Sequence, residues 1–233
     1  PNLENPETET ATLSVYRSPK FWLPVGILLL SLIIDQAIKI YVKTHYWPGQ
    51  MVPLLGNWFN MYFIENNGMA FGIELGGRTG KFLLTGFRIA VSIFGAWYLW
   101  QNIRKYAHTG LLVSIAFILA GAIGNIIDSV FYGVLFRHRN FDYEGGWFEG
   151  RVVDMFYAPI IESRFPQWLP IWGGQEFTFF SPIWNFADAC ITIGVVIIIL
   201  GQHRFFSHTL KKESADSPAD ASTNNTQQEN LTD

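Results

Sequence analysis

The sequence predicts an all-α membrane protein in which four transmembrane helices carry a small extracytoplasmic β-structure and a long outer loop. Three observations lead to this fold class: four long apolar segments, few charged residues, and aromatic residues at the ends of the apolar segments. Of the 233 residues, 49% are hydrophobic and 15% are charged, whereas a typical soluble domain has about 25% charged residues. This composition is typical of a chain that lies largely in lipid.

Four segments are long enough to cross a bilayer, because a spanning helix needs about 20 mostly apolar residues. They are residues 21–43, 82–100, 110–136 and 183–201. Aromatic side chains at their ends, such as Trp22 and Trp100, are typical of anchors at the membrane–water interface. The first segment is too long for a cleavable signal peptide, and no small-residue cleavage site follows it.

The two ends of the chain are polar and differ from the body between them. Residues 1–19 form a polar N-terminal segment, residues 20–206 the four-helix membrane domain, and residues 207–233 a tail that is acidic from Glu213 onwards. The tail has no aromatic residues, and its composition predicts a disordered segment. The bases of the body flank the spans instead of forming a patch, so nucleic acid is not an expected partner.

Basic residues near the spans predict the orientation of the chain. They occur before the first span (Arg17 and Lys20), in the short 101–109 connection, and after the fourth span. The positive-inside rule therefore places both termini in the cytoplasm. The 137–182 segment also holds four arginines, but the rule gives less weight to long loops.

Two long connections, 44–81 and 137–182, then lie outside. The first is rich in β-branched and aromatic residues, with turn signals at Gly56-Asn57 and Asn66-Asn67-Gly68, and predicts a β-hairpin or small sheet. The second is rich in aromatic residues and prolines, and we expect it to lie along the membrane interface.

Five ionisable residues fall within the predicted spans, where each is costly and indicates function by default. They are Asp35, Lys39, Arg88, Asp128 and Asp188. Asp35 and Lys39 are four residues apart, so they share a helix face and can form an ion pair. The ordinary explanation for Arg88 is snorkelling to the membrane surface.

Several carboxylates are expected at one depth, near the outer face. Asp128 lies late in the third span and Asp188 early in the fourth, each with an asparagine three residues earlier, while Asp154 follows in the outer connection. Converging carboxylates can share a proton and hydrolyse a bond, bind a divalent metal, or relay protons. The residues by themselves leave these three chemistries open.

Other catalytic patterns are missing from the sequence. The five histidines are dispersed and the only cysteine is Cys190, so the sequence has no zinc-ligand spacing. With one cysteine, an intrachain disulfide is not possible. There is no G-x-S-x-G or H-E-x-x-H motif, which argues against serine and zinc peptidases.

Five short motifs, taken in chain order, resemble the lipoprotein signal peptidase (signal peptidase II) family. They are DQAIK at 35–39, ENNGMAFG at 65–72, GAIGNIID at 121–128, GRVVDMF at 150–156 and WNFADACI at 184–191. Together they span most of residues 20–200. The resemblance implies an aspartyl endopeptidase of the bacterial inner membrane, with its active site near the outer face.

The resemblance also implies a substrate and a set of site residues. The substrate would be a diacylglyceryl-modified prolipoprotein, cleaved just before the lipidated cysteine, and membrane lipid would be the other partner. A monomer without metal or cofactor is expected. The family's catalytic pair matches Asp154 and Asp188. Positions that bind substrate or support the site match Asp35, Lys39, Asn66, Gly68, Asn125, Asp128 and Asn185.

The chain departs from the family pattern in two places. The family usually has arginine directly after the aspartate of its N-x-x-D motif, where this chain has Ser129, and serine cannot replace that charge. We expect Arg151 to supply it, with Arg137 or Arg139 as alternatives. The outer connections are also longer than the family pattern, and the aromatic segment can serve as a lid or a membrane-surface platform.

Two functions of other classes compete with the peptidase. An ion- or proton-coupled transporter would also use carboxylates within the membrane, but no internal repeat is visible. A non-enzymatic membrane scaffold would use the same polar residues only to hold its helices together.

Overall fold

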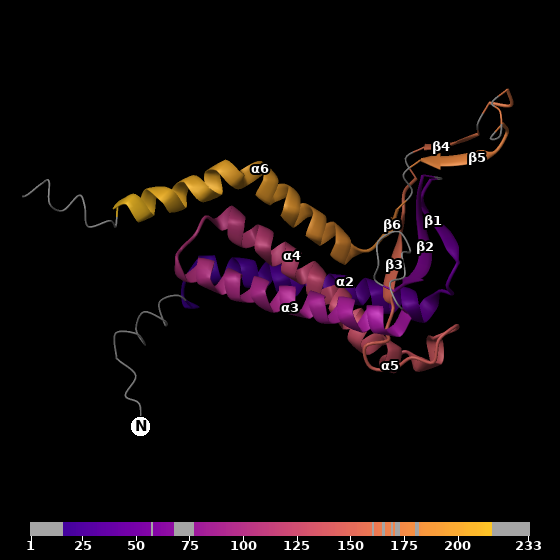
Figure 1. Ribbon diagram of the computed structural model, residues 1–233, viewed down its shortest axis with the longest axis horizontal. Coiled ribbons are helices and arrows are strands. Elements are labelled where there is room, and N and C mark those ends of the chain that lie inside the picture. Colours follow the sequence, from indigo (N-terminus) through magenta and orange to yellow (C-terminus); the bar gives the residue numbers. More distant parts are fainter. Residues whose placement is uncertain are drawn as a thin grey trace, which may run out of the picture.

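Four long helices form a bundle, and a small sheet caps one end of it (Figure 1). The computed structural model describes residues 16–215, except for residues 57, 68–76, 160, 165, 169, 171, 172, 180 and 181. The helices are α2 (Pro19–His45), α3 (Gly77–Arg104), α4 (Thr109–Ile127) and α6 (Phe186–Ala215). The start of α2 and the far end of α6 lie at the same end of the bundle, opposite the sheet (Figure 1).

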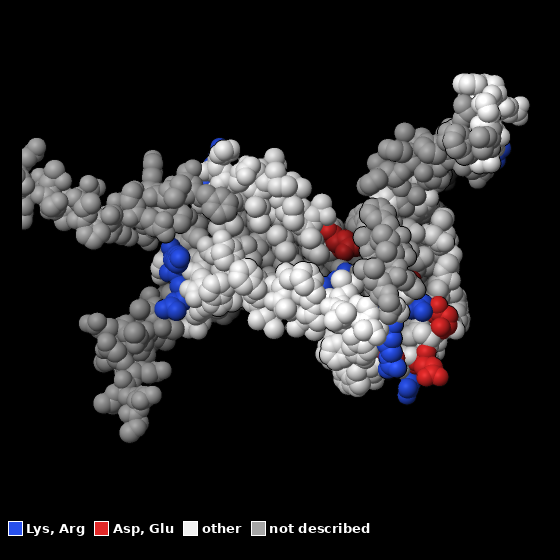
Figure 2. Space-filling model, viewed as in Figure 1, with Lys and Arg blue, Asp and Glu red and all other residues white. Residues whose placement is uncertain are grey.

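The four predicted spans are confirmed, since four helices of the described residues are long and apolar enough to cross a membrane. The third continues from α4 through a π-helical turn, η2 (Asp128–Tyr132), into the short α5 (Gly133–Leu135). The short 3-10 helix η3 (Arg137–Arg139) follows. Figure 2 shows the visible face between the two ends of the bundle to be almost free of charged residues, as expected of a lipid-facing surface.

The fourth helix differs from the expectation at both of its ends. It begins at Phe186 instead of residue 183, because Ile183 and Trp184 form a strand. At the other end it continues to Ala215, beyond residue 207, where the tail was expected to start. Residues 216–233 of the expected tail lie outside the described part of the chain.

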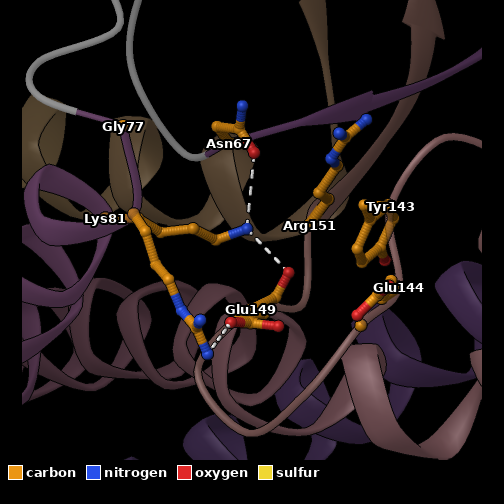
Figure 3. A pocket seen from close by; sticks show the side chains of 9 residues that line it. Asn67, Gly77, Lys81, Tyr143, Glu144, Glu149 and Arg151 are labelled. Atoms are coloured by element: carbon orange, nitrogen blue, oxygen red, sulfur yellow. Dashed lines mark hydrogen bonds and ion pairs between the residues drawn. The ribbon is translucent and has the colours of Figure 1, made fainter.

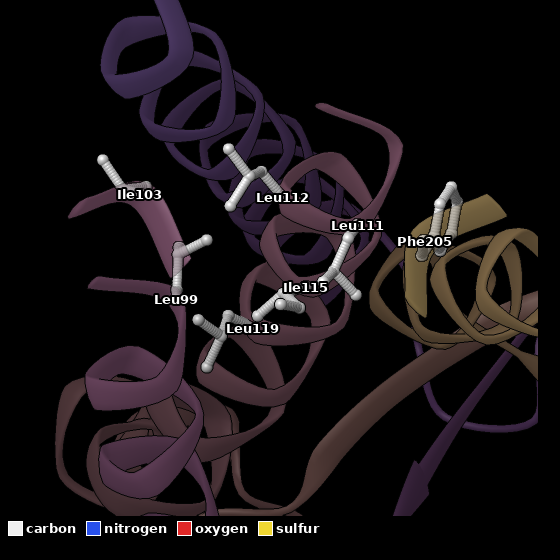
Figure 4. Close-up of a cluster of buried hydrophobic side chains, with 7 residues drawn as sticks. All are labelled: Leu99, Ile103, Leu111, Leu112, Ile115, Leu119 and Phe205. Carbon is white, nitrogen blue, oxygen red and sulfur yellow. The ribbon is translucent and has the colours of Figure 1, made fainter. Parts of the chain in front are cut away.

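Helix α4 is the centre of the bundle and packs against α2, α3 and α6. In its most apolar window 56% of the residues are buried, against 17% in each of the other three spans. Figure 4 shows one apolar cluster around it, made of residues from α3, α4 and α6. Its members are Leu99, Ile103, Leu111, Leu112, Ile115, Leu119 and Phe205.

The sheet has the strand order β1-β2-β3-β6, with every neighbouring pair antiparallel. Its strands are β1 (Met51–Leu55), β2 (Phe59–Asn66), β3 (Val152–Tyr157) and β6 (Ile183–Trp184). The predicted β-structure within 44–81 is confirmed as the β1–β2 hairpin. The expected long outer loop, 137–182, also contains strand β3 and a second hairpin, β4 (Ile161–Arg164) and β5 (Glu176–Phe179), which extends away from the sheet (Figure 1).

Two sets of contacts join the sheet to the bundle. The apolar set, from α2, η2, β2 and β3, consists of Val42, Met61, Phe63, Tyr132, Val153 and Met155. The polar set includes a buried ion pair between Lys43 of α2 and Glu65 of β2. Because both sets are buried, β2 and β3 are held at a fixed position above the helix ends.

The close approach of α4 and α6 depends on a glycine. A Cβ atom added to Gly121 would lie 2.2 Å from the Ala187 carbonyl oxygen and 2.7 Å from Cγ1 of Ile191. Small residues at helix interfaces in membranes allow such approaches. An alanine here would push apart α4 and α6, the pair of helices with the most extensive contact in the bundle.

We therefore expect Gly121→Ala to lower the free energy of unfolding by about 1–3 kcal/mol, the usual cost of overpacking. The measurement is thermal unfolding of the detergent-solubilised protein. Gly86→Ala is the matched control, because Gly86 lies in α3 with open space around it; alanine there should be neutral or stabilising. Equal stability of the two variants would contradict the packing argument.

Candidate active site

Polar side chains from three helices and one strand meet where the sheet sits on the bundle. Almost all of them are buried, and three of the four carboxylates are at most 2% exposed. The residues are Asp35 and Lys39 of α2, Asn125 of α4, Asp128 of η2, Asp154 of β3, Asn185 just before α6, and Asp188 in its first turn. Such a cluster is stable only if its members satisfy one another's charges and hydrogen bonds.

Lys39 is the cation at the centre of the cluster, and its side chain is fully buried. Its Nζ lies 3.0 Å from Oδ2 of Asp35 and 2.8 Å from Oδ2 of Asp128. The same ammonium donates to Oδ1 of Asn125 at 2.8 Å. The predicted Asp35–Lys39 ion pair is present. The contacts of Lys39 with Asp128 and Asn125 join α2 to the third span.

Two residues that the sequence did not single out complete this part of the cluster. Gln36 Nε2 donates to Oδ2 of Asp35 and to Oδ1 of Asp128, both at 3.1 Å. The Tyr132 hydroxyl donates to Oε1 of Gln36 at 3.0 Å. The only sequence signal for Gln36 was its place in the D-Q-A-I-K motif, and Tyr132 had none.

The start of α6 is fixed by two of the cluster's side chains. Oδ1 of Asn185 accepts from the backbone N–H of Asp188 at 2.9 Å, in the manner of a helix N-cap. Oδ1 of Asp35 accepts from the backbone N–H of Ala187 at 2.8 Å. A carboxylate is favourable at this position because the N-terminal end of a helix is electropositive.

Asp154 and Asp188 are each oriented by amide groups from other elements. Oδ1 of Asp154 accepts from Asn185 Nδ2 at 2.6 Å, and its Oδ2 accepts from Asn66 Nδ2 at 3.2 Å. Oδ1 of Asp188 accepts from Asn125 Nδ2 at 3.0 Å. The register that places Asp154 opposite Ile64 brings β3 beside the end of β2, where Asn66 lies.

The two carboxylates differ in their surroundings. Asp154 is 2% exposed, whereas Asp188 is only half-buried. Burial, followed by the neighbouring charge of Asp188, raises the pKa of Asp154 to about 7, although the hydrogen bonds from Asn66 and Asn185 oppose this rise. Near neutral pH Asp154 can therefore hold a proton, which general acid–base chemistry requires.

Asp128 has the bonding of a structural residue. Besides Lys39 and Gln36, its carboxylate accepts from the backbone N–H of Val153 at 3.4 Å, which connects the third span to β3. It begins the π-helical turn, a feature that is frequent at functional sites. The neighbouring Ser129 is 2% exposed, and its hydroxyl donates to the carbonyl oxygen of Asn125 at 2.9 Å.

Arg151, the expected replacement for the family arginine, has other partners. Its guanidinium lies 2.6 Å from Oδ2 of Asp142 and stacks over the ring of Tyr143. The physical reason is the alternation of side chains along a strand, which directs residues three apart to opposite faces. Its position three residues before Asp154 therefore turns its side chain away from that carboxylate.

The two alternative arginines are also bonded elsewhere. Arg139 donates to the carbonyl oxygens of Lys43 and Tyr46, and Arg137 donates to that of Glu144. Gly68, the remaining residue expected at the site, lies outside the described part of the chain.

A pocket of about 330 Å³ is lined by residues that neighbour the site residues in sequence. Among them, Asn67 follows Asn66, and Arg151 lies three residues before Asp154. Figure 3 shows Lys81 between Asn67 and Glu149, donating to Oδ1 of the first at 3.3 Å and to the carbonyl oxygen of the second at 2.8 Å. Arg78 forms an ion pair with Glu149. Opposite charges therefore compensate one another along this wall.

Removing the central cation, Lys39, should destabilise the protein. We expect Lys39→Met to lower the free energy of unfolding by about 3–5 kcal/mol, because buried carboxylates lose their counter-ion. Adding Asp128→Asn to Lys39→Met should restore part of the loss. Thermal unfolding in detergent measures both variants, with Lys105→Met at an exposed position as control; an unchanged Lys39→Met protein would refute the argument.

Comparisons with known proteins point to one family. The family model described as signal peptidase (SPase) II matches residues 27–204. A lipoprotein signal peptidase of Porphyromonas gingivalis is 47% identical over 194 residues, which are 79% of this chain and 84% of that protein. One from Amoebophilus asiaticus is 36% identical over 206 residues, covering 87% and 86%.

A solved structure described as a bacterial membrane enzyme is 25% identical, covers 84% of this chain and 92% of its own, and superposes with a TM-score of 0.49. The family match covers well over half of the chain. The second and third spans lie within the matched residues, and the first and fourth overlap its two ends. The chain therefore belongs to the signal peptidase II family and is a multi-pass membrane protease.

Proposed function

We propose that this protein removes the signal peptide from diacylglyceryl-modified prolipoproteins, with Asp154 and Asp188 as the catalytic pair. The observation that carries this proposal is that two electrostatically coupled carboxylates, one buried and one half-buried, are each oriented by asparagine amides. Membership of the signal peptidase II family supports the substrate class.

In the proposed mechanism the pair carries one proton, which lies mainly on the more buried Asp154. The ionised Asp188 removes a proton from a water molecule as its oxygen attacks the scissile carbonyl carbon. Asp154 donates its proton to the carbonyl oxygen, which becomes part of a tetrahedral intermediate. Return of a proton to the leaving nitrogen breaks the carbon–nitrogen bond and releases a carboxylate and an amine.

The other residues of the cluster have supporting roles in this proposal. The amides of Asn66 and Asn185 hold Asp154, and the amide of Asn125 holds Asp188. Their orientation before substrate arrives lowers the reorganisation needed in the transition state. Lys39 and Asp35 fix the helices that carry these groups.

The substrate's acyl chains are proposed to remain in the bilayer beside the helices. The outward faces of α2 and α3 suit such contact, because Ile33, Leu83 and Phe87 are each more than 60% exposed. Since the catalytic pair belongs to a single chain, we propose a monomer as the working unit. Scission just before the lipidated cysteine would leave the diacylated product anchored in the membrane.

We further propose that the protein lies in the bacterial inner membrane, with cytoplasmic termini and the sheet and active site near the outer face. The charge pattern supports this orientation, because basic residues flank the helix ends opposite the sheet. The orientation is measured by labelling single cysteines, introduced at Gly174 or at Gln202, from outside intact cells. Labelling at Gly174 alone is expected, and labelling at Gln202 alone would indicate the opposite orientation.

The catalytic assignment is tested with a diacylated prolipoprotein peptide and purified enzyme. Asp154→Asn and Asp188→Asn should each lower kcat by at least about 10³-fold, because neither amide can exchange a proton. Asp142→Asn is the control, since Asp142 is mostly exposed and pairs with Arg151. Full activity in either catalytic variant would refute the pair, and loss of wild-type activity on chelation would indicate metal chemistry instead.

The pH dependence follows from the raised pKa of Asp154. Below about pH 7 the pair keeps its proton, and above it Asp154 ionises, so kcat/KM should fall as pH rises through about 7. Asn66→Ala removes a hydrogen bond that favours the ionised form, so the pKa should rise. The falling limb should then move to higher pH by up to about one unit.

Asn60→Ala is a matched control for this profile, because Asn60 lies in the same strand, away from the pair. Its falling limb should coincide with that of the wild type. A limb that moves to lower pH in Asn66→Ala would contradict the assignment of the proton to Asp154.

A further inference from the structure

The carboxylate cluster carries more negative than positive charge. Asp35 and Asp128 contribute one negative charge each, and the proposed singly protonated pair contributes a third, while Lys39 contributes one positive charge. Uncompensated charge is costly where water is excluded. A second cation near the pair would therefore stabilise the cluster.

That cation does not come from the sequence positions where it was expected. Ser129 carries no charge, and its hydroxyl is bonded to the Asn125 carbonyl oxygen. Arg151 is paired with Asp142 and stacked on Tyr143. The two further candidates, Arg137 and Arg139, donate to backbone carbonyl oxygens outside the cluster.

Helix α3 directs a different arginine at the cluster. Arg88 is half-buried and lies three residues after Thr85 and four before Ser92, both of which are buried. Residues at this spacing share one helix face, so Arg88 belongs to the face that α3 turns to the bundle. Its guanidinium interacts electrostatically with the carboxylates of Asp188, Asp154 and Asp128, and the interaction with Asp188 is the strongest of the three.

Arg88 lies six residues inside the predicted span that begins at residue 82, which at 1.5 Å per residue is about 9 Å along the helix axis. Its electrostatic partners include the carboxylates of Asp128 in η2, Asp154 in β3 and Asp188 in the first turn of α6. A role beside these carboxylates accounts for its partly buried position on the bundle-facing side of α3.

We propose that Arg88 is a positioning residue of the active site and supplies from α3 the positive charge that the family usually has after the N-x-x-D aspartate. A nearby cation stabilises the negative charge of a carboxylate. Arg88 thus stabilises the negative charge of the catalytic pair. It also offsets the net negative charge that remains when Lys39 has neutralised only one of its two carboxylate partners, Asp35 and Asp128. This inference rests on the proposed catalytic pair.

The first test compares Arg88→Gln with the charge-conserving Arg88→Lys, using the prolipoprotein peptide across a range of pH. Arg88→Gln should lower kcat/KM by at least about tenfold, less than the loss of a group that contacts the reacting oxygen, because Arg88 acts through the carboxylates. The fall of kcat/KM with rising pH should occur at higher pH in Arg88→Gln than in the wild type, because the pair loses a cation that favours ionisation. Arg88→Lys should retain most of the rate and the wild-type limb.

Arg104→Gln is the matched control, because Arg104 lies exposed at the opposite end of the same helix. It should keep the rate and the pH profile of the wild type. A wild-type rate and limb in Arg88→Gln would overturn the proposal. So would a Lys variant as impaired as the Gln variant, because retained charge would then have no effect.

A chemical test avoids any variant that fails to fold. The chain has one cysteine, the buried Cys190, so Arg88→Cys in a Cys190→Ala background offers a single thiol. Modification with 2-aminoethyl methanethiosulfonate restores a positive charge, whereas methyl methanethiosulfonate adds a neutral group of smaller size. The cationic adduct should be several-fold more active, and a reductant should abolish the difference.

Equal activity of the two adducts would overturn the role of Arg88. It would not affect the proposed function, which is decided by Asp154→Asn and Asp188→Asn in an otherwise wild-type protein. If those two variants stay active, the catalytic pair fails, whatever the Arg88 variants do.

Discussion

The buried ammonium of Lys39 is the interaction on which the rest of this site depends. It contacts two carboxylates and one amide, from the first and third spans, at 2.8–3.0 Å. Buried charges are tolerated only when each has a partner, so these helices are held in one relative position. Asp35, fixed by Lys39, then accepts from the backbone of α6 and sets the start of the fourth span as well.

A second constraint runs from this ion cluster to the proposed catalytic pair through asparagine side chains. Asn125 accepts from Lys39 and donates to Asp188, while Asn185 caps α6 and donates to Asp154. An amide can accept and donate at once, which is why asparagine suits a position between a cation and a carboxylate. The ion cluster and the proposed catalytic residues therefore form one hydrogen-bonded network, so a substitution in one part alters the geometry of the other.

Local spacing accounts for what could be predicted of the site. The Asp35–Lys39 pair and the asparagines three residues before Asp128 and Asp188 follow from helical geometry. The same reasoning misled for Arg151, because Asp154 lies in a strand, where residues three apart face opposite ways. For Arg88 the sequence favours snorkelling as the ordinary explanation, since its sequence neighbours are apolar and its charged partners come from other elements. Gln36 and Tyr132 were missed for the same reason: their importance lies in contacts across the bundle.

The sequence by itself determined the four membrane spans, the β1–β2 hairpin, the family, and the carboxylates proposed for the site. These features depend on hydropathy, turn residues and short motifs, which are local properties of the chain. Only the tertiary structure decided that α4 is the central helix, that β3 completes a sheet with β2 and β6, and that Asp154 lies between Asn66 and Asn185. Strand pairing and helix packing join residues far apart in the chain, so no local pattern specifies them.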